Sequence, residues 1–195
     1  MYPGGDRPVK ESDFDGRITE PYFGVGWTKV YIEKMCEFYS RLGRTRFTVV
    51  RHSNVYGPHD KYDLEKSHVF GATVAKVMGA RDGKVVVWGD GSEARDLLYA
   101  ADLADFVEAA LERQETPFEL VNVGSGAAVS VAELVKRIIA RSGRELSVEY
   151  DRLKPTIPFA LAVDWSRAKT LFGWEPRTSL DDGIDKSLAW YRENQ

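Results

Sequence analysis

Short β-branched runs alternate with amphipathic helical stretches along this chain, and no other feature limits its possible folds as strongly. Strands are predicted at residues 46–51, 84–88, 96–99, 118–123 and 146–150. Helices are predicted at 27–42, 69–78 and 102–113, after the capping pair Ser130 and Glu133, after Asp164, and from Ser179 to about Asn194. Strands separated by helices indicate an α/β fold with a parallel sheet, because each helix carries the chain back along a sheet face.

The length and composition are those of a globular protein, and the small net charge favours no highly charged partner. Its 195 residues fit one domain or a piece of a larger one. Hydrophobic residues make up 43% and charged residues 29%. A net charge of -3 favours neither nucleic acid nor a membrane surface as a partner, and no apolar run approaches the roughly 20 residues of a membrane span. We expect a cytoplasmic protein, because the chain shows no secretory signal and its single cysteine, Cys36, fits a reducing compartment as a buried thiol.

The dinucleotide-binding pattern is incomplete. Such a fold opens with a strand, a glycine-rich turn and a helix, followed about 20 residues later by an acid for the ribose. The first hundred residues contain no such series. The nearest match is Gly124-Ser125-Gly126, which follows a strand but lacks the third glycine. A tight turn between strand and helix is the favoured interpretation, and a phosphate site is the alternative.

Lys29 is the first candidate for a catalytic residue. A lysine and the residue four positions before it share a helix face, so an ammonium there can stabilise a phenolate and reach a ribose hydroxyl. That earlier position holds Val25, and Tyr22 lies seven residues before the lysine. Seven helical residues rise about 10 Å. Tyr22 could therefore act only if Gly24 and Gly26 permit a looped insertion, and otherwise Lys29 is a surface charge.

Six segments, in order, resemble the extended short-chain dehydrogenase/reductase family, the nucleotide-sugar epimerases, dehydratases and reductases. They are MYP at 1–3, GWTK at 26–29, HSNVYGP at 52–58, WGDGSEARD at 88–96 with DLA at 102–104, NVGSG at 122–126 and GWEP at 173–176. The first is similar to the stretch after the family's catalytic serine or threonine. The second is similar to the lysine end of its Tyr-x-x-x-Lys site. The resemblance covers nearly the whole chain.

The resemblance implies an NADP or NAD cofactor and assigns residues to it. Lys29 would hold the cofactor and act in catalysis, with Tyr22 as a candidate replacement for the missing phenol. The cofactor would also contact His52, Ser53, Asn54, Val55 and His68. Without the resemblance, Asn54 would be interpreted as a turn residue.

On the substrate side, residues 57–69 are most similar to the family branch that epimerises and reduces GDP-linked keto sugars. There His68 would be the general acid of epimerisation, a role that suits histidine. Arg95 would clamp the diphosphate of a nucleotide-diphosphate sugar, while Trp88 and Lys76 would contact the same substrate. The alternatives are a helix-start histidine bonded to the backbone, a core tryptophan and an exposed lysine. The three histidines are not spaced as a metal site.

The resemblance implies the C-terminal part of such an enzyme. Residues 1–66 and 97–125 would belong to a Rossmann-type nucleotide-binding domain, and 67–96 and 126–195 to a smaller substrate-binding domain. The chain departs from the family in its missing glycine-rich loop, its missing triad serine and Val25. The alternative function is therefore a catalytically inactive nucleotide-sugar-binding module, and a relative of UDP-sugar 4-epimerases or dTDP-sugar dehydratases is a third possibility. In this family the 27–42 helix often forms a dimer interface, so we expect a homodimer.

Overall fold

The computed structural model describes residues 2, 5, 7–64, 66–154, 156 and 159–195. The helices are η1 (Glu11–Asp13), η2 (Glu20–Tyr22), α1 (Phe23–Ser40), α2 (Val69–Gly79), α3 (Ala100–Arg113), α4 (Val131–Ser142), α5 (Ser166–Phe172) and α6 (Leu180–Asn194). The strands are β1 (Phe47–His52), β2 (Asn54–Tyr56), β3 (Lys84–Trp88), β4 (Ala94–Tyr99), β5 (Phe118–Val123), β6 (Ala128–Ser130), β7 (Ser147–Asp151) and β8 (Ala160–Leu161). Every predicted strand is present. The sequence does not predict β2, β6 and β8, because such short strands show no alternating pattern.

Parallel pairing dominates the sheets, which confirms the predicted α/β fold class. The pairs β1–β5, β2–β4, β3–β7 and β4–β8 are parallel, and β4–β6 is antiparallel. In the first pair Phe47 lies opposite Phe118 and His52 opposite Val123. Among the described residues β1 pairs only with β5, so its second edge has no strand beside it.

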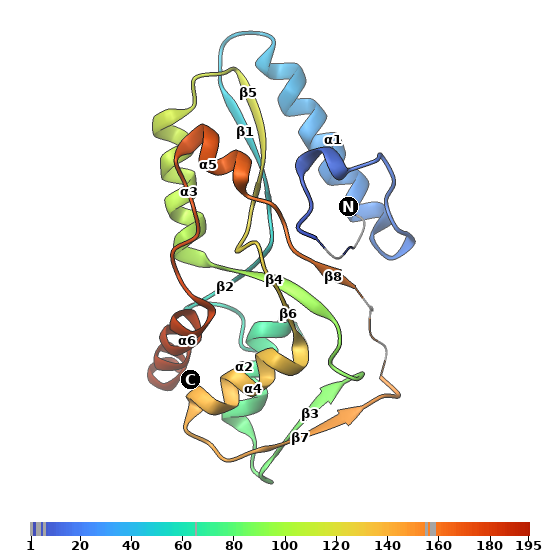
Figure 1. Cartoon of the computed structure of the whole chain (residues 1–195), viewed down its shortest axis with the longest axis vertical. Coiled ribbons are helices and arrows are strands. Elements are labelled where there is room, and N and C mark those ends of the chain that lie inside the picture. Colours follow the sequence, from blue (N-terminus) through green and yellow to red (C-terminus); the bar gives the residue numbers. More distant parts are fainter. Residues whose placement is uncertain (1, 3–4, 6, 65, 155, 157–158) are drawn as a thin grey trace.

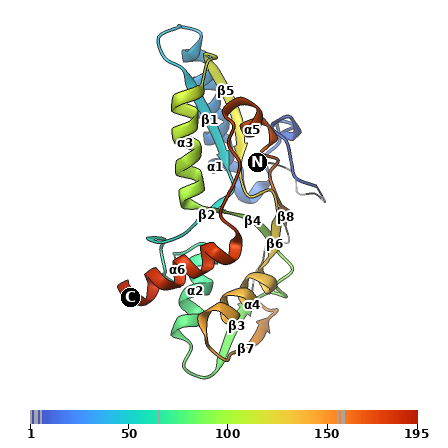
Figure 2. The same ribbon diagram turned by 60° about the vertical axis from the view of Figure 1, so that its left-hand side comes forward.

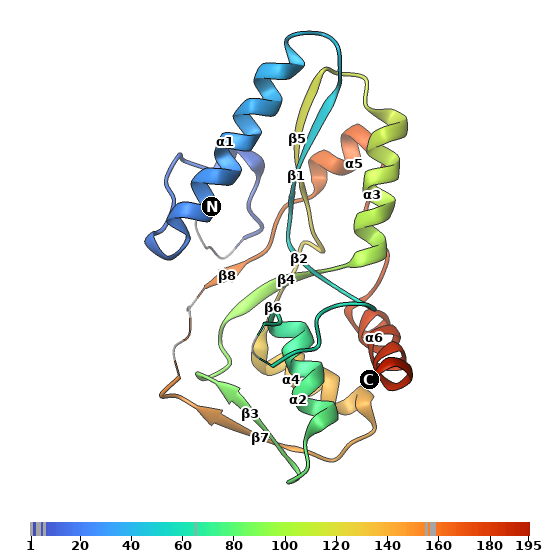
Figure 3. The same ribbon diagram turned by 180° about the vertical axis from the view of Figure 1, so that it is seen from behind.

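The elements gather at two ends of an elongated molecule (Figure 1). At one end α1 covers one face of the β1–β5 pair, and α3 and α5 lie on the other side (Figure 3). At the opposite end α2, α4 and α6 lie together beside the β3–β7 pair (Figure 2). The strand β4 runs between the two ends, so it connects the two halves of the structure.

Each end has its own hydrophobic core. The first is built by residues of β4, α3, β5 and α5 with the segment that follows, among them Leu98, Phe106, Val121, Phe172 and Trp174. The second is built by β2, α2, β3, α4 and α6, among them Tyr56, Phe70, Val74, Ile138 and Leu188. The division into two domains at the expected boundaries stays a prediction. The structure adds that α5, expected in the substrate-binding domain, packs on α3 and β5.

The predicted caps Ser130 and Ser179 are confirmed, whereas the predicted cap Asp164 is not, because the N-cap of α5 is Trp165, which makes no side-chain cap hydrogen bond; Asp164 instead accepts the Ser166 N–H at 2.8 Å. The Ser130 hydroxyl accepts the Glu133 N–H at 3.1 Å, and the Ser179 hydroxyl accepts the Asp182 N–H at 3.1 Å. The Glu133 carboxylate in turn accepts from Arg137 at 2.8 Å. Each cap satisfies an N–H that the first helical turn leaves without a partner.

The helix α1 begins four residues before its predicted start at Trp27. The short helix η2 leads directly into it, and Gly24 and Gly26 both lie inside α1. A Cβ at Gly26 would lie 2.6 Å from Cγ2 of Ile18, so glycine allows the preceding loop to approach the helix closely. The expected burial of Cys36 is only partial, because its side chain is half-buried on this helix.

The N-terminal segment is tied to the sheet through Arg51. The Tyr2 hydroxyl donates to Asn122 at 2.6 Å and accepts from the Arg51 guanidinium at 2.8 Å. That guanidinium lies 5.2 Å from the ring centre of Tyr2 and 5.3 Å from that of Phe14. It also pairs with the buried carboxylate of Glu33 on α1 at 2.7 Å. One buried cation therefore joins the N-terminal segment, β1 and α1.

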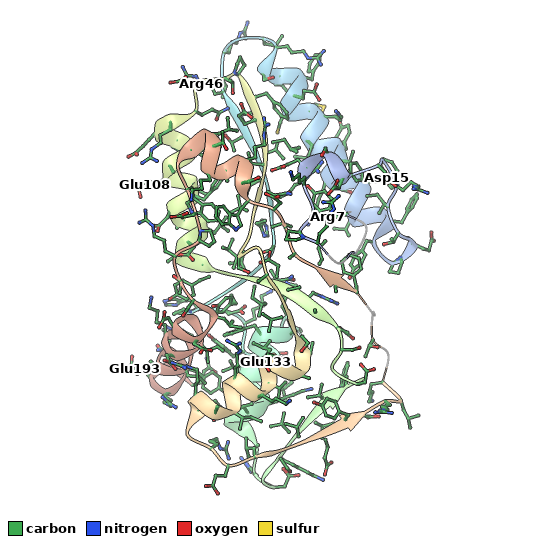
Figure 4. All side chains as sticks on the ribbon, viewed as in Figure 1. Arg7, Asp15, Arg46, Glu108, Glu133 and Glu193 are labelled. Atoms are coloured by element: carbon green, nitrogen blue, oxygen red, sulfur yellow. The ribbon has the colours of Figure 1, made fainter. Side chains whose placement is uncertain are left out.

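Charged side chains are exposed at both ends of the molecule. Figure 4 shows the side chains of Glu108 on α3 and Glu193 on α6 at the periphery, pointing away from the ribbon. None of the helices in the described part of the chain is both long and apolar enough to span a membrane.

The packing at Gly183 provides a test of the second core. A Cβ there would lie 2.0 Å from the hydroxyl oxygen of the buried Tyr56. We expect Gly183→Ala to lower the free energy of unfolding by about 1 to 3 kcal/mol, because overpacking forces the tyrosine to shift. Urea denaturation measures it. Gly79→Ala on α2, where no atom lies within 4 Å of the new Cβ, is the control and should not destabilise the chain. Equal stability of the two variants would contradict this packing.

Candidate functional site

Asp96 is a buried carboxylate just beyond the carboxyl ends of β1 and β5, and it is 1% exposed. It accepts the N–H and the hydroxyl of Ser125, each at 2.8 Å. It also accepts the N–H groups of Gly126 and Val163, each at 3.1 Å. Four donors therefore surround one internal anion. The N–H groups of Ser125 and Gly126 in the turn at 124–126 are bonded to this carboxylate, which favours a structural turn over a phosphate site.

The predicted nicotinamide loop lies next to this carboxylate. A Cβ on Gly124 would be 2.7 Å from Asp96 Oδ2 and 3.1 Å from Ser53 Oγ. The Ser53 hydroxyl is buried and has no hydrogen-bond partner among the described residues. Asn54 lies in β2 rather than in a turn, and its side-chain amide donates to the Asp96 carbonyl at 3.2 Å.

His52 and Val55 flank Ser53 and Asn54 in the sequence. A ring nitrogen of His52, Nδ1, lies 2.8 Å from the Ser53 carbonyl oxygen. Val55 pairs with Leu98 in the β2–β4 ladder. The structure thus brings the four predicted residues 52–55 to the carboxyl end of a parallel pair, where ligands of open α/β sheets bind.

Lys29 lies on α1 without a phenol one turn away. Because α1 is helical from Phe23, no loop shortens the spacing between Tyr22 and Lys29. Tyr22, Val25 and Lys29 share one exposed helix face, with the tyrosine two turns from the lysine. The catalytic role of Tyr22 stays a prediction, and this helical spacing weighs against it. Met1 and Pro3 of the first resembling segment lie outside the described residues.

Trp88 is the centre of a basic and aromatic cluster. It is 51% exposed, so it is not a core residue. The Lys76 ammonium lies 5.3 Å and the Lys154 ammonium 5.5 Å from its ring centre, within the range of cation–π attraction. Lys76 also donates to the Val86 carbonyl at 3.0 Å, and burial lowers the pKa of its ammonium. Lys76 is therefore a half-buried cation rather than an exposed helix charge.

Sequence reasoning missed Lys154. No spacing in the chain relates it to Trp88, because the two residues belong to segments that meet only through the β3–β7 pairing. In that register Trp88 lies opposite Asp151, and Lys154 follows shortly after. A prediction of this pairing was the only signal that could have identified it.

The Arg95 side chain is held in place by hydrogen bonds and an ion pair with neighbouring residues. Its guanidinium donates to the carbonyls of Ala94 at 3.0 Å and Phe159 at 2.5 Å, and pairs with the Glu93 carboxylate at 3.3 Å. The side chain is largely buried, at 19% exposure. Arg95 stands at the start of β4, one short connection after Trp88 at the end of β3. A phosphate would have to compete with Glu93 for this guanidinium.

His68 occupies the N-cap position of α2, where its carbonyl accepts the Ala72 N–H at 3.0 Å. Its exposed side chain makes no capping hydrogen bond, so the alternative of a histidine bonded to the helix start applies only to its backbone. In the part of the chain that the structure describes, no three His, Cys, Asp or Glu residues group together as a metal site would require.

A family model described as "NAD dependent epimerase/dehydratase family" matches residues 1–124. The putative GDP-L-fucose synthase 2 of Arabidopsis thaliana is 36% identical, with 100% of this chain and 60% of that protein aligned. The GDP-L-fucose synthase of Escherichia coli K12 is 32% identical, with 100% of this chain and 64% of that protein aligned. The chain thus spans about three fifths of the length of these curated relatives.

Solved structures show the same fold. The UDP-glucose 4-epimerase of Thermotoga maritima, solved with UDP-glucose, superposes with a TM-score of 0.80 at 26% identity, over 97% of this chain and 58% of that one. The UDP-glucuronic acid 4-epimerase of Bacillus cereus, in complex with UDP-glucuronic acid and NAD, superposes with a TM-score of 0.81 at 25% identity, over 100% of this chain and 59% of that one.

We expect Asp96→Asn to lower the free energy of unfolding by about 2 to 4 kcal/mol, because the amide loses charge and one of its two acceptor atoms. Urea denaturation of both proteins measures the loss. Asp90→Asn is the control, since Asp90 bonds only its exposed neighbour Ser92 in the described contacts and should cost much less. An Asp96 variant as stable as the Asp90 variant would contradict the central role of this carboxylate.

Proposed function

Because the chain belongs to the NAD dependent epimerase/dehydratase family, we propose that it is the C-terminal, substrate-binding portion of a nucleotide-sugar epimerase/reductase similar to GDP-L-fucose synthase. The observation that carries the proposal is the cluster of Trp88, Lys76 and Lys154, because a half-exposed aromatic ring between two ammonium groups suits a nucleotide diphosphate. In this proposal the substrate side of the chain, residues 67–96 and 126–195, contains the cluster. Residues 1–66 and 97–125 form the remainder of the nucleotide-binding domain.

The substrate side binds by stacking and charge. Trp88 offers its face to the base or the sugar, and the ammonium groups of Lys76 and Lys154 neutralise phosphate charge. Arg95 exchanges Glu93 for the diphosphate, which a guanidinium binds bidentately. His68 donates a proton to the substrate carbon during epimerisation, as a general acid does.

The residues fit the nicotinamide end of a cofactor better than its phosphate end. Ser53 has a buried hydroxyl without a described partner, His52, Asn54 and Val55 lie beside it, and Lys29 is exposed on α1. The phosphate end finds no cradle in the turn at 124–126, whose N–H groups are bonded to Asp96. When bound, NAD or NADP supplies hydride transfer. In this chain Lys29 would hold the ribose, and residues 52–55 would orient the ring.

The second candidate function is a binding module without catalysis, and Val25 favours it. A valine cannot transfer a proton, and loss of an acid–base group removes a factor of about 100 to 10,000 in rate. The two candidates share the same substrate side. They differ in whether a cofactor binds and whether Tyr22 or another chain supplies the phenol.

Calorimetry with GDP and with NADPH tests the substrate side. We expect the chain to bind GDP and to bind NADPH far more weakly, because the ammonium groups of Lys76 and Lys154 lie together on the proposed substrate side, around Trp88. Arg95→Leu and Trp88→Ala should each weaken GDP binding at least tenfold. Arg81→Leu, which removes an exposed arginine before β3, is the matched control. Undetectable GDP binding by a folded chain would contradict the proposal, and tight NADPH binding would contradict the binding-module alternative.

The exposed face of α1 favours a homodimer. Its exposed large apolar side chains are Phe23, Val25, Trp27, Tyr31, Ile32, Phe38 and Tyr39. A helix this apolar on its outer surface is normally covered. We expect light scattering at micromolar concentration to give twice the 22.0 kDa chain mass. Tyr31→Asp should produce monomers, while Leu111→Asp on α3, which replaces an 83% exposed leucine, should not. A monomeric unmodified chain would contradict the dimer.

A further inference from the structure

Glu93 places a negative charge at a site that is proposed to bind a diphosphate. It directly precedes β4, and its main-chain carbonyl accepts the Val131 N–H at 2.8 Å. The first turn of α4 therefore fixes the backbone of this residue. Its carboxylate lies 3.3 Å from Nη2 of Arg95, and both side chains are only 19% exposed. The backbone thus keeps an acid beside the guanidinium that would bind phosphate.

The Arg95 guanidinium is anchored through one nitrogen and paired through another. Nη1 donates to the main-chain carbonyls of Ala94 at 3.0 Å and Phe159 at 2.5 Å. Because both acceptors belong to the backbone, they hold the guanidinium whether or not a ligand is bound. Nη2 faces the Glu93 carboxylate. A guanidinium binds a phosphate through two neighbouring N–H groups, so a phosphate on Arg95 needs the edge that Glu93 now occupies.

The lysines around Trp88 differ from Arg95 in this respect. The described contacts of their ammonium groups are with the Trp88 ring and, for Lys76, with a main-chain carbonyl. An anion can approach these ammonium groups without displacing a carboxylate. A phosphate on Arg95 gains only the difference between its own attraction to the guanidinium and the attraction that Glu93 already provides.

We propose that Glu93 is a specificity-determining residue, whose carboxylate keeps Arg95 from free phosphate and yields to a phosphate already tethered at Trp88. This inference rests on the proposed function, in which Arg95 and the Trp88 cluster bind one substrate. A nucleotide held at Trp88 presents its diphosphate to Arg95 at a high effective concentration, and that concentration favours displacement of Glu93. Inorganic phosphate has no base to stack on Trp88, so it lacks this advantage.

Calorimetry of the whole chain with inorganic phosphate and with GDP tests this role. We expect Glu93→Gln to tighten phosphate binding by about tenfold or more, because it removes a unit charge beside the guanidinium. GDP binding should tighten by a smaller factor, so the preference for GDP over phosphate should narrow. Glu175→Gln, which removes the same charge from an exposed pair with Lys169, is the control and should change neither affinity. Phosphate binding that is equal in Glu93→Gln and the unmodified chain would overturn the proposal.

A double-mutant cycle shows whether Glu93 acts through Arg95. In the Arg95→Leu background, Glu93→Gln should no longer tighten phosphate binding, because the guanidinium that the carboxylate covers is gone. The same gain with and without Arg95 would contradict the proposed mechanism. Glu93→Ala provides a second reading if Glu93→Gln does not fold, since it also removes the carboxylate and keeps the main-chain carbonyl that accepts the Val131 N–H.

The role of Glu93 and the proposed function fail separately. GDP binding by the unmodified chain, with no gain in phosphate binding in Glu93→Gln, would leave the substrate site in place and remove the role of Glu93. Tighter phosphate binding in Glu93→Gln, with no GDP binding by either protein, would support the competition at Arg95 and contradict the proposed function.

Discussion

The Asp96 carboxylate is the interaction on which the two ends of the molecule depend. It lies in β4, the strand that runs between them, and accepts from the turn after β5 and from Val163 before α5. A buried carboxylate is tolerated only when donors surround it, because desolvation costs several kcal/mol per ion. Here two backbone segments distant in sequence supply those donors. The turn at 124–126 and the approach to α5 are positioned by one anion, and the Asn54 side chain donates to the main-chain carbonyl of the same residue.

This arrangement also bears on the proposed phosphate sites. The N–H groups of a glycine turn at the end of a parallel strand attract anions, and in this chain the anion is part of the protein. The cations that remain for a diphosphate lie around Trp88 and at Arg95, beyond β3 and at the start of β4. In the proposed function, a nucleotide sugar and a dinucleotide would therefore contact different residues of this chain.

The sequence predicts the regular elements and little of what joins them. The strands predicted at 84–88 and 118–123 are found at those residues, because β-branched side chains favour strands that are partly buried. The start of α1 differs from the prediction because Gly24 and Gly26, residues that usually break helices, lie inside it, and Gly26 allows close packing on Ile18. The partnership of Trp88 with Lys154, and the hydrogen bond from Arg95 to the Phe159 carbonyl, arise from tertiary contacts. No periodicity of a single segment carries that information, so these parts of the site could not be predicted from the sequence.

The two sides of the molecule differ in how far this chain alone completes them. On the proposed substrate side, the ammonium groups of Lys76 and Lys154 each lie within 5.5 Å of the Trp88 ring centre. On the other side, Lys29 has Val25 in place of a phenol, β1 has no second neighbour among the described residues, and α1 exposes aromatic side chains. An exposed strand edge and an apolar helix face are surfaces that proteins normally cover. In the proposed function the substrate side is therefore contained within this chain, whereas the exposed surfaces of β1 and α1 are the ones that a further segment or chain would cover.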